Sequence, residues 1–144
     1  MLFYHSYDPA TGELLELSVS ATPEWRALQE QAGRTVAESQ TYATPETHNY
    51  LGGALTAKRA GALTPDKTQI TSGGADQAVV AVAVAGEDPP ASLTLLVNGA
   101  AEAVALTHGA GSLAPIVAQT PCLVTVQVAD SITYRAEPVA IQAV

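Results

Sequence analysis

The sequence predicts a mainly β protein in two parts, a small N-terminal α+β unit followed by an antiparallel β-sandwich. Apolar residues alternate with other residues in three late runs, Val80–Val84, Leu93–Val97 and Val124–Val128. A period of two is typical of strands that bury one face. In addition, only one of the seven aromatic residues, Tyr134, lies beyond position 50. The two parts must therefore fill their cores with different side chains, and we expect domains at 1–62 and 63–144.

The first unit should begin with a β-hairpin. Strands are expected at 2–7 and 14–19, joined by the turn Asp-Pro-Ala-Thr-Gly at 8–12, because Asp, Pro and Gly suit successive turn positions. We expect one face of the second strand to be apolar, through Leu15, Leu17 and Val19.

A helix should follow this hairpin. Thr22 can cap its N-terminus, Pro23 suits the first helical position, and Gly33 can end it. The helical spacing predicts that three side chains face inward: Trp25, Leu28 and Ala32.

Two further elements complete the unit. Residues 34–39 should form a short strand, and Tyr50–Leu55 should form a hairpin whose turn is Gly52-Gly53, since glycine tolerates the positive φ angles of such turns. The expected layout is one helix on a small antiparallel sheet.

The second part has the strand number and length of an immunoglobulin-like β-sandwich, with about seven strands in about 80 residues. Pro115 and Pro138 fall inside two of these strands, which should then be edges or carry a bulge. This part has no cysteine pair and no Trp, so apolar packing alone must hold it. The expected strands are 68–72, 78–85, 92–97, 102–107, 112–117, 122–129 and 132–143.

Composition and charge exclude several classes of partner. The net charge is −8, which argues against nucleic acid. No apolar run approaches the length of a membrane span, so we expect no membrane insertion. Residues 1–13 lack the features of a signal peptide, so we expect that the protein is synthesised in a cytoplasm and is not exported. The single cysteine, Cys122, excludes an internal disulfide and should be a buried, inert thiol. Charged residues make up only 14%, which suits either packing against neighbours or an alanine-rich host composition.

No residue pattern points to catalysis. The histidines His5, His48 and His108 are far apart, and none has a second His or Cys at metal-ligand spacing. A triad of Ser131, His108 and Asp130 would lack a nucleophile elbow. We therefore expect no enzyme activity, no metal and no cofactor, with partly exposed, structural histidines.

Four tyrosines are the candidate site residues. Tyr4, Tyr7, Tyr42 and Tyr50 could form a protein-docking or sugar-stacking surface, although packing in the small core is the favoured alternative. Exposed strand edges are a second candidate surface, because an edge can pair with a neighbouring subunit.

Several segments resemble proteins of tailed bacteriophages. Leu63–Val80, with its Lys-Thr-Gln-Ile strand and Gly-Gly-Ala-Asp turn, resembles the opening of immunoglobulin-like domains in phage tail proteins. Thr120–Val126 resembles a late strand of such modules. Tyr4–Glu13, with Tyr-Asp-Pro-Ala-Thr-Gly-Glu, is similar to the openings of small virion and tail-fibre-associated proteins, and Tyr50–Leu55 is similar to the hairpin that links their two parts.

The resemblance implies a structural virion protein in the tail tip, the baseplate or the fibre attachment. It would contact other virion proteins and form a homo-oligomer within the particle. Assembly in the host cytoplasm and release by lysis would need no export signal. The alternatives are a tail-fibre assembly chaperone, and a capsid decoration or receptor- or glycan-binding module. By order and composition, the first unit would dock and the sandwich would project or bridge neighbours.

Overall fold

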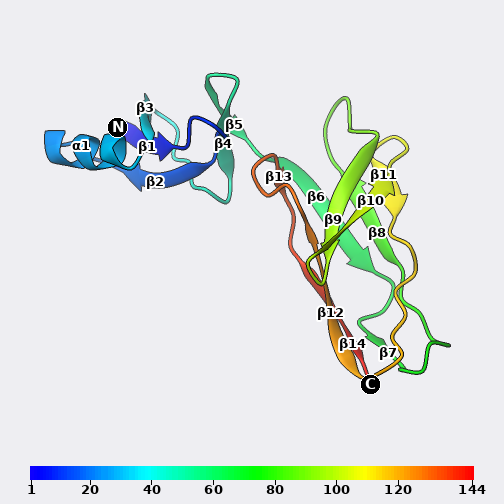
Figure 1. The fold of residues 1–144 in the computed structure, drawn as a ribbon. Coiled ribbons are helices and arrows are strands. Elements are labelled where there is room, and N and C mark those ends of the chain that lie inside the picture. Colours follow the sequence, from blue (N-terminus) through cyan, green and yellow to red (C-terminus); the bar gives the residue numbers. More distant parts are fainter. The chain divides into compact units, whose positions relative to one another are not determined.

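The computed structural model describes all 144 residues. Strands hold 49% of the residues and the one helix holds 6%, which confirms a mainly β fold with a single helix. The chain separates into two compact units, Met1–Lys58 and Arg59–Val144 (Figure 1). The boundary expected at 62/63 falls inside β6 (Arg59–Pro65), which belongs whole to the second unit.

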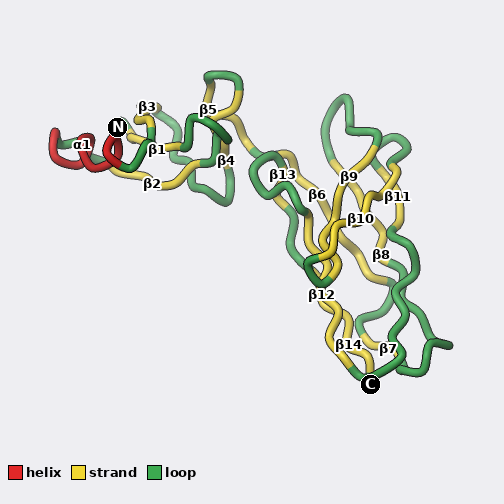
Figure 2. The backbone as a smooth tube through the Cα atoms, in the orientation of Figure 1, coloured by secondary structure: helices red, strands yellow, loops and turns green.

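The first unit contains a three-stranded antiparallel sheet in the order β2-β1-β3, a helix and a separate hairpin (Figure 2). The hairpin pairs β4 with β5 around Gly52 and Gly53, which both have positive φ, as the two-residue turn requires. The elements are β1 (Phe3–Tyr7), β2 (Leu14–Ser18), α1 (Pro23–Gln31), β3 (Thr35–Ser39), β4 (His48–Leu51) and β5 (Ala54–Ala57).

The β1–β2 pair contains a bulge that changes which apolar residues share a face. The register runs from Ser6 opposite Glu16 directly to Tyr7 opposite Leu14, so Leu15 is skipped. Leu14 is consequently buried, with 2% of its surface exposed, whereas Val19 is 66% exposed. Leu15 and Leu17 are both half-buried, so the expected apolar face is wrong only at Val19, which lies beyond the end of β2 at Ser18.

Helix α1 begins as expected but turns a different face inward. The Thr22 side chain accepts a hydrogen bond from the Trp25 backbone N–H at 3.2 Å, which caps the N-terminus. Trp25 is half-buried, as expected, but the prediction is wrong for Leu28, which is 62% exposed, and for Ala32, which is exposed. Gln29 is buried in their place. Gln29 can be buried because its side-chain amide donates a hydrogen bond to Glu16 Oε2 on β2 at 2.8 Å.

The second unit is a sandwich of two sheets. One sheet has the order β10-β9-β12-β14-β7 and the other has the order β11-β8-β6-β13. If β6, β8, β9, β12 and β14 are lettered A, B, C, F and G, strands C, F and G share one sheet and strands A and B the other, as in immunoglobulin-like domains. The remaining strands of this unit are β7 (Gln69–Ile70), β8 (Val80–Val84), β9 (Ser92–Val97), β10 (Ala100–Ala105), β11 (Ala110–Ser112), β12 (Cys122–Val128), β13 (Tyr134–Arg135) and β14 (Val139–Ala143).

The core of the sandwich follows the alternation seen in the sequence. Val80, Val82 and Val84 on β8 are buried, and the alanines between them are exposed. The same pattern confirms the buried faces of β9 and β12. The fully enclosed positions include Ile70, Leu95, Val126 and Ile141, which fill the space between the two sheets.

Three strand assignments differ from expectation. β6 was not predicted at all. In the expected strand 112–117 only Ser112 lies in a strand, and beyond it only Ile116 makes a β-bridge, with Ala78. The expected strand 132–143 divides into β13 and β14. Pro115 and Pro138 lie between ladders and not inside edge strands, since a residue without an N–H cannot continue the pairing.

Candidate functional site

The structure brings two of the four candidate tyrosines together. Tyr7 on β1 and Tyr50 on β4 stack with ring centroids 4.3 Å apart and planes 19° apart. Tyr4 lies on the opposite face of β1, where the Arg26 guanidinium of α1 sits 5.4 Å from its ring centroid. Tyr42 is 64% exposed and meets the Phe3 ring edge-on. The four side chains therefore do not form one continuous surface.

The Tyr7–Tyr50 stack borders a pocket of about 320 Å³. The pocket lies between the 9–12 turn and the 50–53 hairpin turn, so it joins the two N-terminal segments on which the phage resemblance rests. The Tyr50 backbone N–H donates to the Gly12 carbonyl at 2.7 Å, and Glu13 forms a β-bridge with Asn49. A Cβ atom on Gly12 would lie 2.8 Å from the Tyr50 carbonyl oxygen, so only glycine allows this approach.

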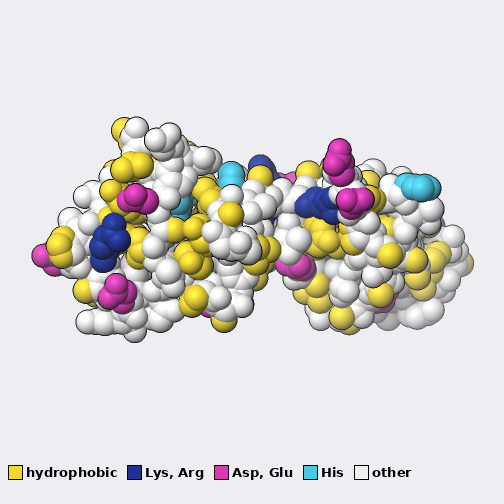
Figure 3. Space-filling view, turned by 90° about the horizontal axis from the view of Figure 1, so that it is seen from above, with side chains coloured by type: hydrophobic (Ala, Val, Ile, Leu, Met, Phe, Trp, Pro, Cys, Tyr) yellow, Lys and Arg dark blue, Asp and Glu magenta, His cyan; other side chains and the backbone are white.

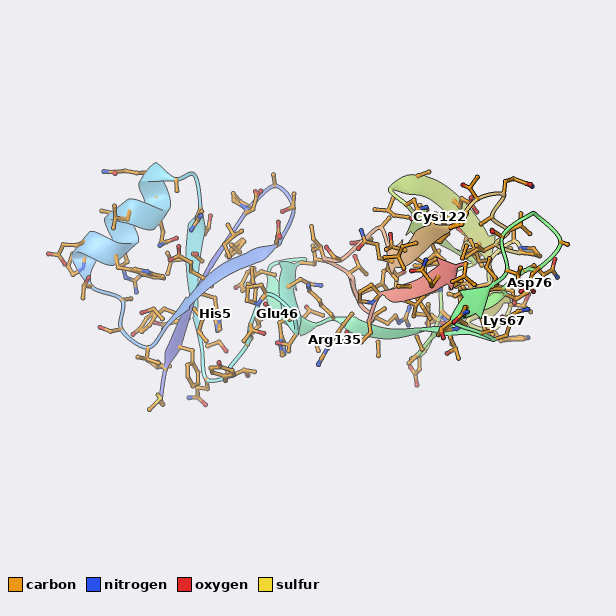
Figure 4. The ribbon with its side chains drawn as sticks, turned by 90° about the horizontal axis from the view of Figure 1, so that it is seen from below. His5, Glu46, Lys67, Asp76, Cys122 and Arg135 are labelled. Atoms are coloured by element: carbon orange, nitrogen blue, oxygen red, sulfur yellow. The ribbon has the colours of Figure 1, made fainter.

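The interior of the first unit contains polar side chains. His5 is 1% exposed, and Ser6 and Asn49 are also buried. Burial lowers the pKa of His5, His48 nearby lowers it further, and the Thr41 backbone opposes both effects. Burial therefore disfavours the protonated form of the His5 imidazole, which lies on β1 (Figure 4). The expectation of a partly exposed histidine is wrong for His5. The residues next to it in the sequence do not show that both faces of β1, the central strand, are covered.

The other histidines and the imagined triad are separate local features. His48 Nδ1 lies 2.8 Å from Thr47 Oγ1, and His108 is exposed in a tight turn with φ of 52°. Asp130 Oδ1 accepts the backbone N–H groups of Ile132 and Thr133, so this carboxylate shapes its own turn. No group of three or more His, Cys, Asp or Glu side chains is placed to hold a metal ion.

Charged side chains in the second unit also stabilise loops. Asp76 pairs with Lys67 and accepts the backbone N–H of Thr71 at 2.8 Å, so it fixes the 71–77 loop (Figure 4). The hydrogen bond from Lys67 is the main cause that lowers the pKa of Asp76.

Cys122 is exposed, which corrects the expectation of a buried thiol. On the face shown in Figure 3, charged side chains are few and scattered.

The free edges of the sandwich differ in length. Strands β7 and β13 have two residues and β11 has three, whereas β10 at the end of the five-stranded sheet has six. A groove of about 250 Å³ lies beside β10, between Glu102, the end of β9 and the 113–117 segment. The sequence indicated exposed strand edges as a candidate surface, but it did not show which strand forms the free edge, because strand order is a non-local property.

Comparison with models of protein families, with curated proteins and with solved structures finds no significant match. The one helix of the chain, α1, lacks the length and apolar character needed to span a membrane.

Proposed function

We propose that this chain is a structural protein of a tailed bacteriophage particle, a component of the tail tip, the baseplate or the fibre attachment. It acts through protein–protein contacts. The observation that carries the proposal is the pairing of an immunoglobulin-like sandwich with a separately packed α+β unit, in the order that the resembling phage proteins have.

The contact between the two N-terminal segments supports the same reading. The Tyr-Asp-Pro-Ala-Thr-Gly-Glu turn and the Tyr-Leu-Gly-Gly-Ala-Leu hairpin are far apart in sequence, yet they pack on each other through Gly12 and Tyr50. Two motifs that form one structural unit are more specific than two unrelated turns. The open β10 edge and the low charge of the chain suit a protein surrounded by neighbours.

We assign docking to the first unit and projection to the sandwich. Particles assembled with residues 1–58 alone in place of the full chain should still incorporate the fragment. Incorporation of 59–144 but not of 1–58 would reverse these roles.

Immunogold labelling of intact particles with an antibody against residues 59–144 tests the location. Label on the tail supports the proposal, and label on the head favours a capsid decoration protein. A chain that is abundant in the infected cell but gives no label on particles favours a tail-fibre assembly chaperone.

Glycan binding is a second candidate, favoured by the pocket beside Tyr7 and Tyr50. Aromatic rings next to an open pocket are typical of sugar-stacking sites, although here each ring uses one face for the other. A glycan array with the full chain, compared with Tyr50→Ala, tests this function: binding that is lost in the variant supports it, and no binding to any glycan contradicts it.

A further inference from the structure

The β10 edge presents unpaired backbone groups over a stretch of alanines. β9 and β10 are joined by the two-residue turn Asn98-Gly99, with both residues at positive φ, so Val97 and Ala100 form the hydrogen-bonded pair next to the turn. Leu106 continues the same alternation, since its N–H donates to the Ala91 carbonyl at 2.8 Å. Even-numbered residues therefore bond to β9, and Ala101, Ala103 and Ala105 direct their N–H and C=O groups away from it.

The free part of the edge centres on Ala101 and Ala103. At the far end, Gly111 lies so close to the Ala105 carbonyl oxygen that no side chain would fit between them. Ala101 and Ala103 are exposed, and β10 has no strand paired beyond it at these two residues. A strand from another molecule could therefore bond to these two residues without replacing a strand of this chain.

Glu102 lies between these two alanines and places a negative charge on the β10 edge. Its side chain lines the groove beside β10 together with Val97, Leu113 and Ile116. The basic residues of the second unit lie elsewhere: Arg59 is on β6, Lys67 is in the β6–β7 connection and Arg135 is on β13. Glu102 is exposed and forms no ion pair within the chain.

We propose that the β10 edge binds an extended segment of a different protein that carries a basic residue opposite Glu102 and small residues on either side. The basic side chain would pair with the Glu102 carboxylate, while its aliphatic stem would lie along the apolar groove. This inference rests on the proposed role of the chain in assembly through protein contacts, and it names the chemistry of the partner.

The same geometry disfavours a second copy of the chain as the occupant. Antiparallel self-pairing that uses the two free residues sets Ala101 opposite Ala103 of the other copy, which places the two Glu102 side chains directly opposite each other. These would form a non-hydrogen-bonded pair, in which side chains approach most closely, and like charges there are destabilising. Glu102 therefore acts against self-association and in favour of a basic segment.

Peptides copied from the strand itself supply the probe. The full chain, labelled with ¹⁵N, is titrated with a peptide of residues 99–105 that carries Glu102→Lys, and separately with the unchanged peptide. We expect the Lys peptide to shift the amide signals of Ala101 and Ala103 and to bind about tenfold more tightly than the Glu peptide, because opposite charges replace like charges in a cross-strand pair.

Three protein variants locate the effect. Glu102→Gln should reduce the preference for the Lys peptide to less than about twofold, whereas Glu137→Gln, which removes an exposed acid from the β13–β14 connection, should leave it unchanged. Ala103→Pro should abolish the shifts, since it removes an outward N–H without touching the β9 pairing.

Several results would overturn the inference. These are equal binding of the two peptides, no shift at the highest soluble peptide concentration, unchanged binding to Ala103→Pro, or shifts of Ala101 and Ala103 that depend on the concentration of the chain alone. The last result would identify β10 as a contact between copies. If immunogold label is found on the phage tail and any of these results is obtained, the inference fails but the proposed function stands. If the Lys peptide binds as expected but the particles carry no label, only the proposed role in the particle is refuted.

Discussion

The rings of Tyr7 and Tyr50 stack at 4.3 Å, and this contact ties the three-stranded sheet of the first unit to its separate hairpin. Beside it, the Gly12 carbonyl accepts the Tyr50 N–H. The aromatic pair and this backbone contact both help to position the hairpin, and both can be tested by substitution.

Tyr50→Ala should lower the free energy of unfolding of the first unit by about 2 kcal/mol, because it removes a half-buried ring and its stacking partner. Tyr50→Phe keeps the ring and should change stability by less than about 0.5 kcal/mol. Urea unfolding followed by the fluorescence of Trp25, the only Trp of the chain, measures this unit selectively. Equal losses in the two variants would show that the hydroxyl, and not the stack, holds the hairpin.

Gly12 and Gly33 form a matched pair of positions for substitution. A change at Gly33 tests backbone strain alone, and a change at Gly12 tests backbone strain together with steric crowding. Both have similar φ angles, +77° and +75°, but only Gly12 has a neighbour within reach of an added Cβ, the Tyr50 carbonyl at 2.8 Å and Leu51. Gly33→Ala should cost about 1 kcal/mol from backbone strain alone, and Gly12→Ala should cost at least about twice as much. Thermal unfolding of the two variants checks this. Equal losses of stability in the two variants would contradict the close packing of the 8–12 turn on the β4–β5 hairpin.

The first unit should lose stability as the pH falls below 6.5. Burial lowers the pKa of His5 in the folded state, so the unfolded state binds more protons once the pH passes below its ordinary value of 6.5. In the upper part of this range, down to about pH 5.5, the effect is separate from Glu16, Glu46 and Asp76, whose lowered pKa values affect stability only as the pH approaches their ordinary values of 4.5 and 3.8. Unfolding measured across this window should depend less on pH in His5→Gln. In His108→Asn, which alters an exposed histidine of the other unit, the dependence should persist. A pH-independent stability of the natural chain would refute a neutral, buried His5.

Residues 59–144 should fold without the first unit. Their core is continuous between the two sheets and includes Leu95, Val126 and Ile141. The isolated fragment should unfold in one cooperative transition and give dispersed amide signals in an NMR spectrum. A fragment that is molten or aggregated would show that the sandwich needs the first unit, contrary to the division between Lys58 and Arg59.

Local pattern predicted those features that a single strand or turn determines. Val80, Val82 and Val84 alternate with alanine, and a strand with such a pattern can bury only one face, so β8 was evident from the sequence. The Gly52-Gly53 turn and the Thr22 cap were evident for similar reasons, since each depends on residues within four positions.

Features that depend on distant partners were not predictable in this way. Gln29 is buried because Glu16 accepts its amide, and Leu28 beside it is left exposed, which reverses the helical pattern. β6 buries only Leu63 fully and becomes a strand through its pairing with β8. Exposed strand edges were expected as a candidate surface, but β10 could not be named as the edge, because its exposure follows from the order of the sheet, which places no partner beyond it.

Quantitative mass spectrometry of gradient-purified phage particles tests the central claim most directly. If the chain is a structural virion protein, peptides from both 1–58 and 59–144 should be present in the particle fraction, in a constant ratio to known tail proteins across the gradient. The chain in the infected-cell lysate together with its absence from the particle fraction would contradict the claim.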